Sequence, residues 1–260
     1  MAAANRKKRQ RCDTNDVKIS MVVNNHRAVE EGPARKHWST HDLLHLRPLT
    51  ENQKLAMHHF SQGDQMLLSG SPGTGKTFLS VYLSMGEVLH PDSPQDHLII
   101  IRSAVATRDQ GFLPGTLEEK QSVFEQPYKD IFAHLFGRAK TYDDMKDARL
   151  VQFMSTSYLR GLTWDNAFVL VDECQNMTFH ELNSIMTRIG TNSRIVFAGD
   201  IPQCDLLKTS RDVTGMQQFQ RIVSRMDEFT EIAFTHEDIV RSNLVKSWII
   251  ASEQESKRSQ

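Results

Sequence analysis

Six short apolar runs recur along the chain, and polar or turn-forming residues separate them. They cover residues 66–70, 97–102, 150–154, 168–172, 194–199 and 231–235. Their interiors are continuously apolar, which is typical of strands that are covered on both faces. The stretches between them have the length and periodicity of helices, and this alternation favours a mainly parallel sheet with helices on both faces. The pattern predicts an α/β fold.

The first part of the chain lacks this alternation. Few apolar residues are in register over residues 17–47. We therefore expect an extension over residues 1–48 that is basic and partly disordered, because short charged ends are usually mobile. One main domain follows over residues 49–252, and residues 253–260 form a short tail.

A glycine-rich segment joins the first apolar run to a helical stretch. It fits the pattern G-x-x-x-x-G-K-[ST] and reads Gly70-Ser71-Pro72-Gly73-Thr74-Gly75-Lys76-Thr77. Glycines let backbone N–H groups turn inward around phosphate oxygens, and the following helix directs its positive end toward them. Lys76 can reach the β- and γ-phosphates, and the Thr77 hydroxyl can coordinate Mg²⁺. The segment predicts a nucleoside triphosphate site.

Two carboxylates end the fourth apolar run. A water-bridged Asp172 can hold Mg²⁺, and Glu173 can polarise the water that attacks the γ-phosphate. An acidic turn at the end of a strand is the alternative interpretation. Together with the phosphate-binding segment upstream, the pair predicts an enzyme that hydrolyses a nucleoside triphosphate.

Three further side chains are candidates by position. Gln203 follows the fifth run, and the carboxyl ends of parallel strands share one edge, so Gln203 can sense the γ-phosphate beside Lys76. A simple turn is the alternative. Arg160 and Arg241 each follow a predicted strand and can stabilise charge in the transition state. A surface position or an ion pair remains open for both arginines.

The charge distribution is uneven although the 260 residues carry a formal charge of only -1. Residues 1–50 contain ten Lys and Arg against five Asp and Glu, and the remainder has a net charge of -6. The basic run at residues 6–11 can neutralise nucleic-acid phosphates, or it is a solvated terminus.

Membrane, secretory and disulfide-rich classes are not supported. No apolar run approaches the roughly 18 residues of a membrane span, and no secretory apolar region follows the basic start. We expect a cytoplasmic protein, in the host cytoplasm if it is viral. Cys12, Cys174 and Cys204 lack the spacing of a disulfide framework or a zinc site, and we expect them to be reduced; for Cys174 and Cys204 we expect packing roles.

The chain also resembles the PhoH-like family of P-loop ATPases, which is named for phosphate-starvation induction and is related to superfamily 1 helicases. The similarity runs from about Leu49 to Ile250, and the short core is similar to bacteriophage members. Beyond the phosphate-binding segment, it rests on these strings: Leu49-Thr50-Glu51-Asn52-Gln53, Gly111-Phe112-Leu113-Pro114-Gly115-Thr116-Leu117-Glu118-Glu119-Lys120, Arg160-Gly161, Asp172-Glu173-Cys174-Gln175-Asn176, Thr187-Arg188-Ile189-Gly190, Gly199-Asp200-Ile201-Pro202-Gln203 and Glu237-Asp238-Ile239-Val240-Arg241. The chain departs from the family pattern at three positions, Ser103, Cys174 and Ser242, where proline, alanine and histidine are usual.

The resemblance implies a single RecA-like P-loop domain with ATP and Mg²⁺ as cofactors. Gln53 looks like the glutamine that reads adenine, because a side-chain amide can both donate and accept. Arg102 and Arg108 fall where helicases contact a nucleic-acid strand, and Arg160 is a further candidate; a structural loop is the alternative for residues 102–115. Arg241 occupies the late arginine position of the family and is the candidate for an arginine finger.

A single nucleotide-binding lobe leaves two routes for Arg241: its own site or the site of a neighbouring subunit. We expect a homo-oligomer in the form of a hexameric ring, because heterologous contacts close into rings. The expected function is Mg²⁺-dependent ATP hydrolysis coupled to RNA or single-stranded DNA, as in a helicase. The alternative is an ATP-binding stress switch that assembles with a partner protein. The absence of an acidic metal cluster in the sequence outside the ATP site disfavours a nuclease.

Overall fold

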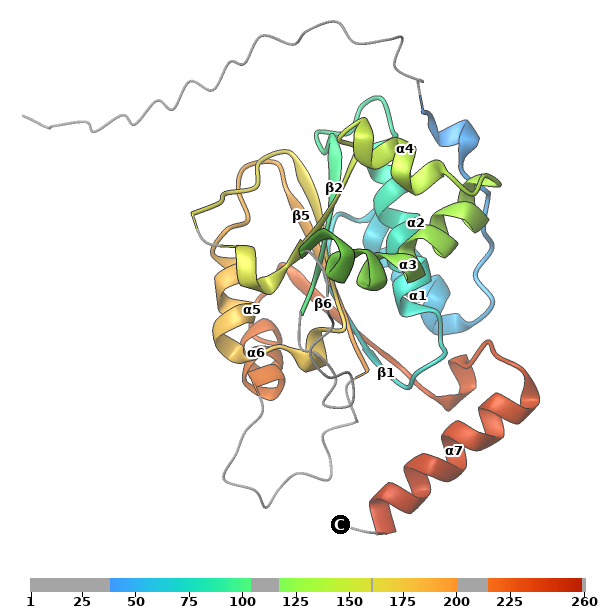
Figure 1. The fold of residues 1–260 in the computed structure, drawn as a ribbon. Helices are drawn as coiled ribbons and strands as arrows, with labels where there is room; N and C mark the ends of the chain where they lie inside the picture. Colours follow the sequence, from blue (N-terminus) through green and yellow to red (C-terminus); the bar gives the residue numbers. More distant parts are fainter. Residues whose placement is uncertain (1–37, 104–116, 160, 201–214, 259–260) are drawn as a thin grey trace, which may run out of the picture. The chain divides into compact units, whose positions relative to one another are not determined.

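A six-stranded sheet lies at the centre of the computed structural model, which describes residues 38–103, 117–159, 161–200 and 215–258 (Figure 1). The strands run in the order β3-β2-β4-β5-β1-β6, and each neighbouring pair is parallel. Their bounds are β1 Gln65–Gly70, β2 His97–Arg102, β3 Val151–Ser155, β4 Ala167–Asp172, β5 Arg194–Ala198 and β6 Phe229–Phe234. All six predicted strands are confirmed, with ends within two residues of the predicted ones.

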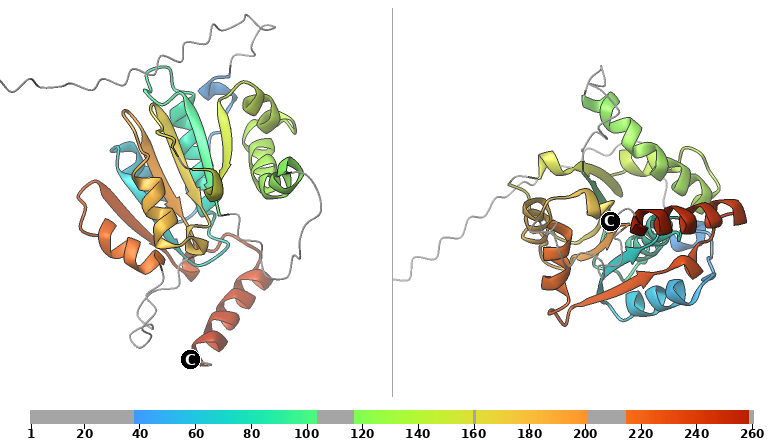
Figure 2. Two further views of the ribbon diagram at one scale, coloured as in Figure 1. Left: turned by 60° about the vertical axis from the view of Figure 1, so that its left-hand side comes forward. Right: turned by 90° about the horizontal axis from the view of Figure 1, so that it is seen from below.

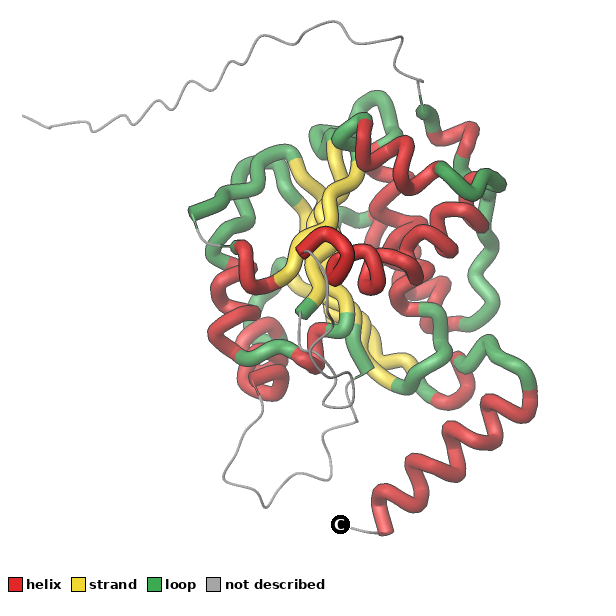
Figure 3. The backbone as a smooth tube through the Cα atoms, viewed as in Figure 1, coloured by secondary structure: helices red, strands yellow, loops and turns green. Residues whose placement is uncertain are grey.

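Helices cover both faces of the sheet, as Figures 2 and 3 show. One face carries α1, α2, α3 and α4, and the other carries α5 and α6. The bounds are α1 Glu51–Ser61, α2 Lys76–Val88, α3 Leu117–Phe136, α4 Thr141–Asp147, α5 Phe179–Met186, α6 Gly215–Val223 and α7 Asn243–Arg258, with short 3₁₀ turns η1 Thr40–Asp42, η2 Thr156–Tyr158, η3 Cys174–Asn176 and η5 His236–Asp238. Within the described residues, no helix has the length and apolarity that crossing a bilayer needs.

Alternate strand residues feed two separate apolar clusters. On β1, Met66 and Leu68 pack under α1 and α2, whereas Leu67 packs toward α5 and α6. All three are completely buried, which explains why the run is apolar throughout instead of alternating. Burial on both faces fixes the register of the central strands, since a slip by one residue would exchange the two clusters.

Part of the predicted extension packs on the first face of the sheet. Trp38 is buried and meets Phe136 of α3 edge to face, with 5.7 Å between the ring centroids. The backbone N–H of Leu44 donates to the carbonyl of Leu135. Trp38 and Leu44 thus contact the C-terminal end of α3, while the basic run at residues 6–11 lies outside the described residues.

The strand order places the predicted site at one edge. Because all strands are parallel, their carboxyl ends share that edge, and β5 alone separates β1 from β4. The phosphate-binding segment after β1 and the carboxylates after β4 are therefore close together. This single RecA-like α/β domain confirms the fold predicted from the sequence.

Candidate nucleotide site

The phosphate-binding loop joins β1 to α2 through three glycines in left-handed conformations. The φ angles are 119° at Gly70, 76° at Gly73 and 84° at Gly75. A side chain at Gly70 would also collide with the backbone carbonyl of Phe234 on the neighbouring strand β6. Glycine is needed there for both reasons. The loop ends where α2 begins at Lys76, so the unpaired N–H groups of the first helical turn face the loop.

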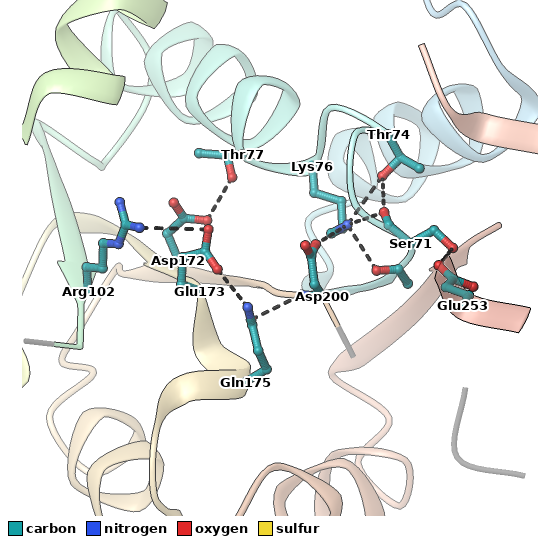
Figure 4. Close-up of polar contacts among 11 residues, drawn as sticks. Ser71, Thr74, Lys76, Thr77, Arg102, Asp172, Glu173, Gln175, Asp200 and Glu253 are labelled. Carbon is teal, nitrogen blue, oxygen red and sulfur yellow. Dashed lines mark hydrogen bonds and ion pairs between the residues drawn. The ribbon is translucent and has the colours of Figure 1, made fainter. Parts of the chain in front are cut away.

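Lys76 is buried and held by oxygen atoms of the loop. Its Nζ donates to the carbonyl of Ser71 at 2.7 Å and to that of Gly70 at 3.2 Å. The same ammonium group forms an ion pair of 2.8 Å with Asp200, which follows β5 (Figure 4). These oxygens hold the positive charge at the mouth of the loop, where the phosphates of a nucleotide would replace Asp200 as its partner.

Thr77 and Asp172 meet directly. The Thr77 hydroxyl donates to Asp172 Oδ1 at 2.8 Å, and the hydroxyl of Tyr128 on α3 donates to Oδ2 at 2.7 Å. Burial raises the pKa of Asp172, and the two hydroxyl donors partly offset that rise. Lys76, which begins α2 after β1, and Asp172, which ends β4, therefore lie at the same edge of the sheet.

The oxygen atoms of Thr77 and Asp172 are hard ligands of the kind that Mg²⁺ takes in proteins. Among the described residues, no group of three or more His, Cys, Asp or Glu side chains is arranged to hold a metal ion. A site with one hydroxyl and one carboxylate nevertheless fits Mg²⁺, because this ion usually binds one or two carboxylates and completes its shell with water and substrate phosphates.

Glu173 adopts a left-handed backbone conformation, with φ 52° and ψ 38°. Such a conformation is uncommon for a residue with a side chain and often marks a functional position. Gln175 Nε2 donates to Glu173 Oε2 at 2.6 Å, and Gln175 Oε1 accepts from the backbone N–H of Asp200 at 3.1 Å. Arg102 approaches Glu173 Oε1 at 3.9 Å. A continuous series of polar contacts thus runs from Arg102 to Lys76 (Figure 4).

Gln53 contacts the phosphate-binding loop, and both the nitrogen and the oxygen of its side-chain amide form hydrogen bonds. Its Nε2 donates to the carbonyl of Thr74 at 3.1 Å, and its Oε1 accepts from the backbone N–H of Leu49 at 2.8 Å. The side chain is 8% exposed. In this geometry Gln53 fastens the start of α1 to the loop, and contact with adenine stays a prediction.

Arg241 lies beside the loop of its own chain. The backbone N–H of the preceding Val240 donates to the carbonyl of Gly73 at 3.1 Å. A Cβ added to Gly73 would lie 3.1 Å from Arg241 Cγ. Arg241 as a whole is an exposed residue.

Helix α7 contributes a contact that the sequence did not suggest. Glu253 Oε1 accepts a hydrogen bond of 3.2 Å from the Ser71 hydroxyl, and Glu253 Oε2 lies 2.5 Å from His236 Nε2. One turn earlier, Ile249 faces Gly73. A carboxylate of α7 therefore borders the phosphate-binding loop, although residue 253 belongs to the predicted tail.

Some predicted residues cannot be placed. Gln203, Arg108 and Arg160 lie outside the described residues. Cys174 is completely buried, and burial raises the pKa of its thiol, in agreement with a packing role. Pro72 belongs to the loop, and its exposed ring takes part in none of the contacts described above.

Four residues of the cluster had no role assigned from the sequence: Tyr128, Gln175, Asp200 and Glu253. Gln175 and Asp200 stand within the quoted family strings, at the ends of β4 and β5, and that position is the signal that could have found them. Tyr128 and Glu253 lie inside helices and belong to no motif. The sequence around them does not indicate which part of the site their side chains contact.

Comparison with known proteins identifies the family. The PhoH-like protein family matches residues 45–253. A PhoH-like protein of Synechocystis is 33% identical over 215 residues, covering 82% of this chain and 64% of the relative. Protein PhoH of Escherichia coli is 31% identical over 205 residues, covering 76% of this chain and 56% of the relative. The chain thus spans less than two thirds of the length of these relatives.

One solved structure is partly similar to this chain. The large terminase of a thermophilic bacteriophage, in complex with ADP, superimposes with a TM-score of 0.49 and 13% identity, covering 77% of this chain and 49% of the terminase. The fold is assigned from the strand order, and no function is inferred from the similarity to the terminase. With this family match, and with a phosphate-binding loop beside a buried acidic strand end, the chain belongs to the PhoH-like protein family.

Proposed function

We propose that this PhoH-like chain binds ATP together with Mg²⁺ and hydrolyses it, and that hydrolysis is coupled to RNA or single-stranded DNA. The observation that carries the proposal is the hydrogen bond of 2.8 Å between Thr77 and Asp172. It joins the phosphate-binding helix to the acidic strand end, which is the pairing that a hydrolytic metal site requires. The choice of ATP rests on the family resemblance of Gln53.

The residues of the site divide the chemistry among them. The loop N–H groups and Lys76 bind the β- and γ-phosphates, and Lys76 exchanges its ion pair with Asp200 for a phosphate oxygen. Thr77 and Asp172 would hold Mg²⁺, which would neutralise charge on the phosphates when bound. Glu173 orients the attacking water and takes up its proton.

Two more residues complete the proposed mechanism. Arg241 supports the charge that develops on the transferred phosphoryl group, from its place beside Gly73. Gln203 senses the γ-phosphate. Both roles remain proposals, since no described contact connects either side chain to the acidic pair.

The coupling to nucleic acid is supported by the position of Arg102. This arginine ends β2 at the carboxyl edge and approaches Glu173, so a polymer that drew Arg102 away would change the surroundings of the proposed catalytic base. Arg108, Arg160 and the basic run at residues 6–11 are the other proposed contacts. Together they would form salt-sensitive contacts with backbone phosphates.

A homo-oligomer in the form of a hexameric ring is part of the same proposal. Helix α7 exposes Leu244 at 80% and Trp248 at 73%, four residues apart on one side of the helix, and adjacent exposed apolar side chains can mark a protein interface. The helix borders the phosphate-binding loop through Glu253, so a neighbour seated on α7 would lie next to the site.

A stress switch with slow turnover is the second candidate function. The observation in its favour is that Lys76 and Ser71 of the loop are already paired with Asp200 and Glu253. A nucleotide must displace these carboxylates, which would slow binding. A protein of this kind would bind ATP and a partner protein without responding to RNA.

The test is ATP turnover on a sample whose mass has been measured by light scattering. Turnover is measured with Mg²⁺ and with EDTA, and each condition is repeated with RNA, with single-stranded DNA and without polymer. The proposal expects Mg²⁺-dependent turnover that a polymer stimulates. Turnover without stimulation supports the switch, and no turnover with Mg²⁺ refutes the enzyme.

A further inference from the structure

Tyr128 reaches the proposed metal site from a helix and not from the loops at the strand ends. It lies in the middle of α3, 44 residues before Asp172 in the chain, and its side chain is completely buried. The ring packs against Phe153 of β3, with 5.8 Å between the ring centroids. The hydroxyl group points to the end of β4 and donates to Asp172 Oδ2 at 2.7 Å.

This hydrogen bond fixes the Asp172 carboxylate from one side. Asp172 is 3% exposed, and a buried carboxylate needs donors for both of its oxygens. Thr77 serves Oδ1 and Tyr128 serves Oδ2. With Thr77 alone, the carboxylate plane could still rotate about the bond to Cβ. The second donor removes that freedom and leaves the free lone pairs of both oxygens in a fixed direction.

Helix α3 is also connected to the second carboxylate, that of Glu173, through Arg102. Phe124 stands four residues before Tyr128, on the same side of the helix. The guanidinium carbon of Arg102 lies 5.9 Å from the centre of the Phe124 ring, and Arg102 in turn approaches Glu173 at 3.9 Å. One helix therefore supports the two acidic residues, directly through Tyr128 and indirectly through Phe124.

We propose that Tyr128 is a positioning residue that orients Asp172 for the metal ion of a Mg²⁺–nucleotide complex. The proposal deepens the proposed function and rests on it. Outer groups that orient a metal ligand typically change metal affinity by about 10- to 100-fold when they are removed. Such a positioning residue changes the affinity for the metal ion and does not change how the loop binds the phosphates.

The test measures nucleotide affinity without relying on turnover. A fluorescent ADP analogue is titrated into wild-type protein and into Tyr128→Phe, first with Mg²⁺ and then with EDTA. The phenylalanine keeps the packing against Phe153 and removes only the hydroxyl. Tyr142→Phe is the matched control, because Tyr142 is also completely buried on the same face of the sheet and packs against Phe132 instead of Asp172.

Mg²⁺ should increase the nucleotide affinity of Tyr128→Phe about 10-fold less than it increases that of wild type. The affinity measured in EDTA should be the same for both proteins. Tyr142→Phe should match wild type in both conditions. Wild-type strengthening in Tyr128→Phe would overturn the inference while leaving the nucleotide site intact. A wild-type protein that binds no nucleotide would instead refute the proposed function.

A second measurement applies if Tyr128→Phe does not fold. Wild-type protein labelled with 3-fluorotyrosine has four ¹⁹F resonances, one for each tyrosine, and phenylalanine variants of the other three assign that of Tyr128. Adding Mg²⁺ to the ADP-bound protein should shift this resonance and leave that of Tyr142 in place. An unmoved Tyr128 resonance would contradict the inference.

Discussion

The Thr77 hydroxyl donates a hydrogen bond of 2.8 Å to Asp172, although 95 residues separate the two in the chain. Thr77 belongs to the first turn of α2, and Asp172 is the last residue of β4. Their contact crosses the end of β5, which lies between the two strands. A hydroxyl and a carboxylate in contact at this edge are placed to share one metal ion, which is the basis of the mechanism proposed above.

Asp172→Asn should separate stability from function. Burial raises the folded-state pKa of Asp172 above its unfolded value, so the ionised form costs folding free energy at pH values above that pKa, and the cost disappears as the pH falls through it. The neutral variant should therefore unfold at a higher Tm than wild type at pH 7, with a smaller difference at pH 4, while Mg²⁺-dependent turnover is lost. Thermal unfolding at both pH values measures this. Asp92→Asn, at an exposed position, serves as the control, and a lower Tm for Asp172→Asn at pH 7 would contradict the argument.

Lys76→Ala should abolish productive nucleotide binding. The variant removes the ammonium group that the loop carbonyls hold at the phosphate position, and it leaves Asp200 without its ion-pair partner. Calorimetric titration with ATP and Mg²⁺ measures the loss. Lys54→Ala is the matched control, because Lys54 is 68% exposed on α1 and pairs with Glu51 of its own helix. Normal affinity in Lys76→Ala would remove the lysine from the site.

Glu173→Gln should bind ATP and retain it. The amide keeps the size of the side chain but cannot take up a proton from water, so turnover should fall by about 10²- to 10⁴-fold. Rapid filtration of protein loaded with radiolabelled ATP would detect the trapped nucleotide. Glu51→Gln, at a fully solvated position on α1, should turn over normally. Unchanged turnover in Glu173→Gln would show that another group is the base.

The fold could be predicted because the strands are buried on both faces. Continuous apolar runs such as that of β4, which is buried at every position, identify a strand without any alternation. The predicted strand ends are less accurate. The strand predicted from residue 231 begins at Phe229, because Phe229 pairs with Gln65, and no local pattern in the sequence indicates that pairing. The strand order follows from contacts between distant segments, such as Met66 beside Val196.

The site could be predicted only where its residues form a local motif. Lys76, Thr77, Asp172 and Glu173 stand at strand ends with recognisable neighbours, and the structure brings them together. Tyr128 was missed because a tyrosine in an amphipathic helix has the pattern of a core residue, and only tertiary packing directs its hydroxyl to β4. Gln203 remains a prediction, because it lies outside the described residues.

Arg241→Ala should spare nucleotide binding and slow hydrolysis, by up to about 10³-fold if the arginine touches the transferred phosphoryl group. Because Arg241 lies beside Gly73 of its own chain, a second experiment asks whether the arginine acts within its own subunit or on a neighbouring one. If the arginine acts within its own subunit, mixing Arg241→Ala with Lys76→Ala protein restores no activity. If it acts on a neighbour, mixed oligomers contain sites with both residues and regain turnover.

Turnover of the mixture across a range of mixing ratios distinguishes the two routes. Mixing must be followed by an exchange step, and mass measurement of differently tagged subunits confirms that mixed species form. Turnover that rises above the sum of the separate variants would contradict action within the subunit. Equal turnover of Arg241→Ala and wild type would show that the arginine has only a structural role.

Glu253→Gln should increase the affinity for ATP. Glu253 places a carboxylate against the Ser71 hydroxyl of the phosphate-binding loop, and a negative charge at this position repels the incoming phosphates. Glutamine can still accept from Ser71, so the variant removes the charge and keeps the contact. The expected gain is several-fold and should shrink at high salt, because screening weakens the repulsion. Glu228→Gln is the control, since it makes the same charge change at the amino end of β6, on the opposite edge of the sheet. An unchanged affinity in Glu253→Gln, measured at low salt, would mean that α7 does not influence the loop electrostatically.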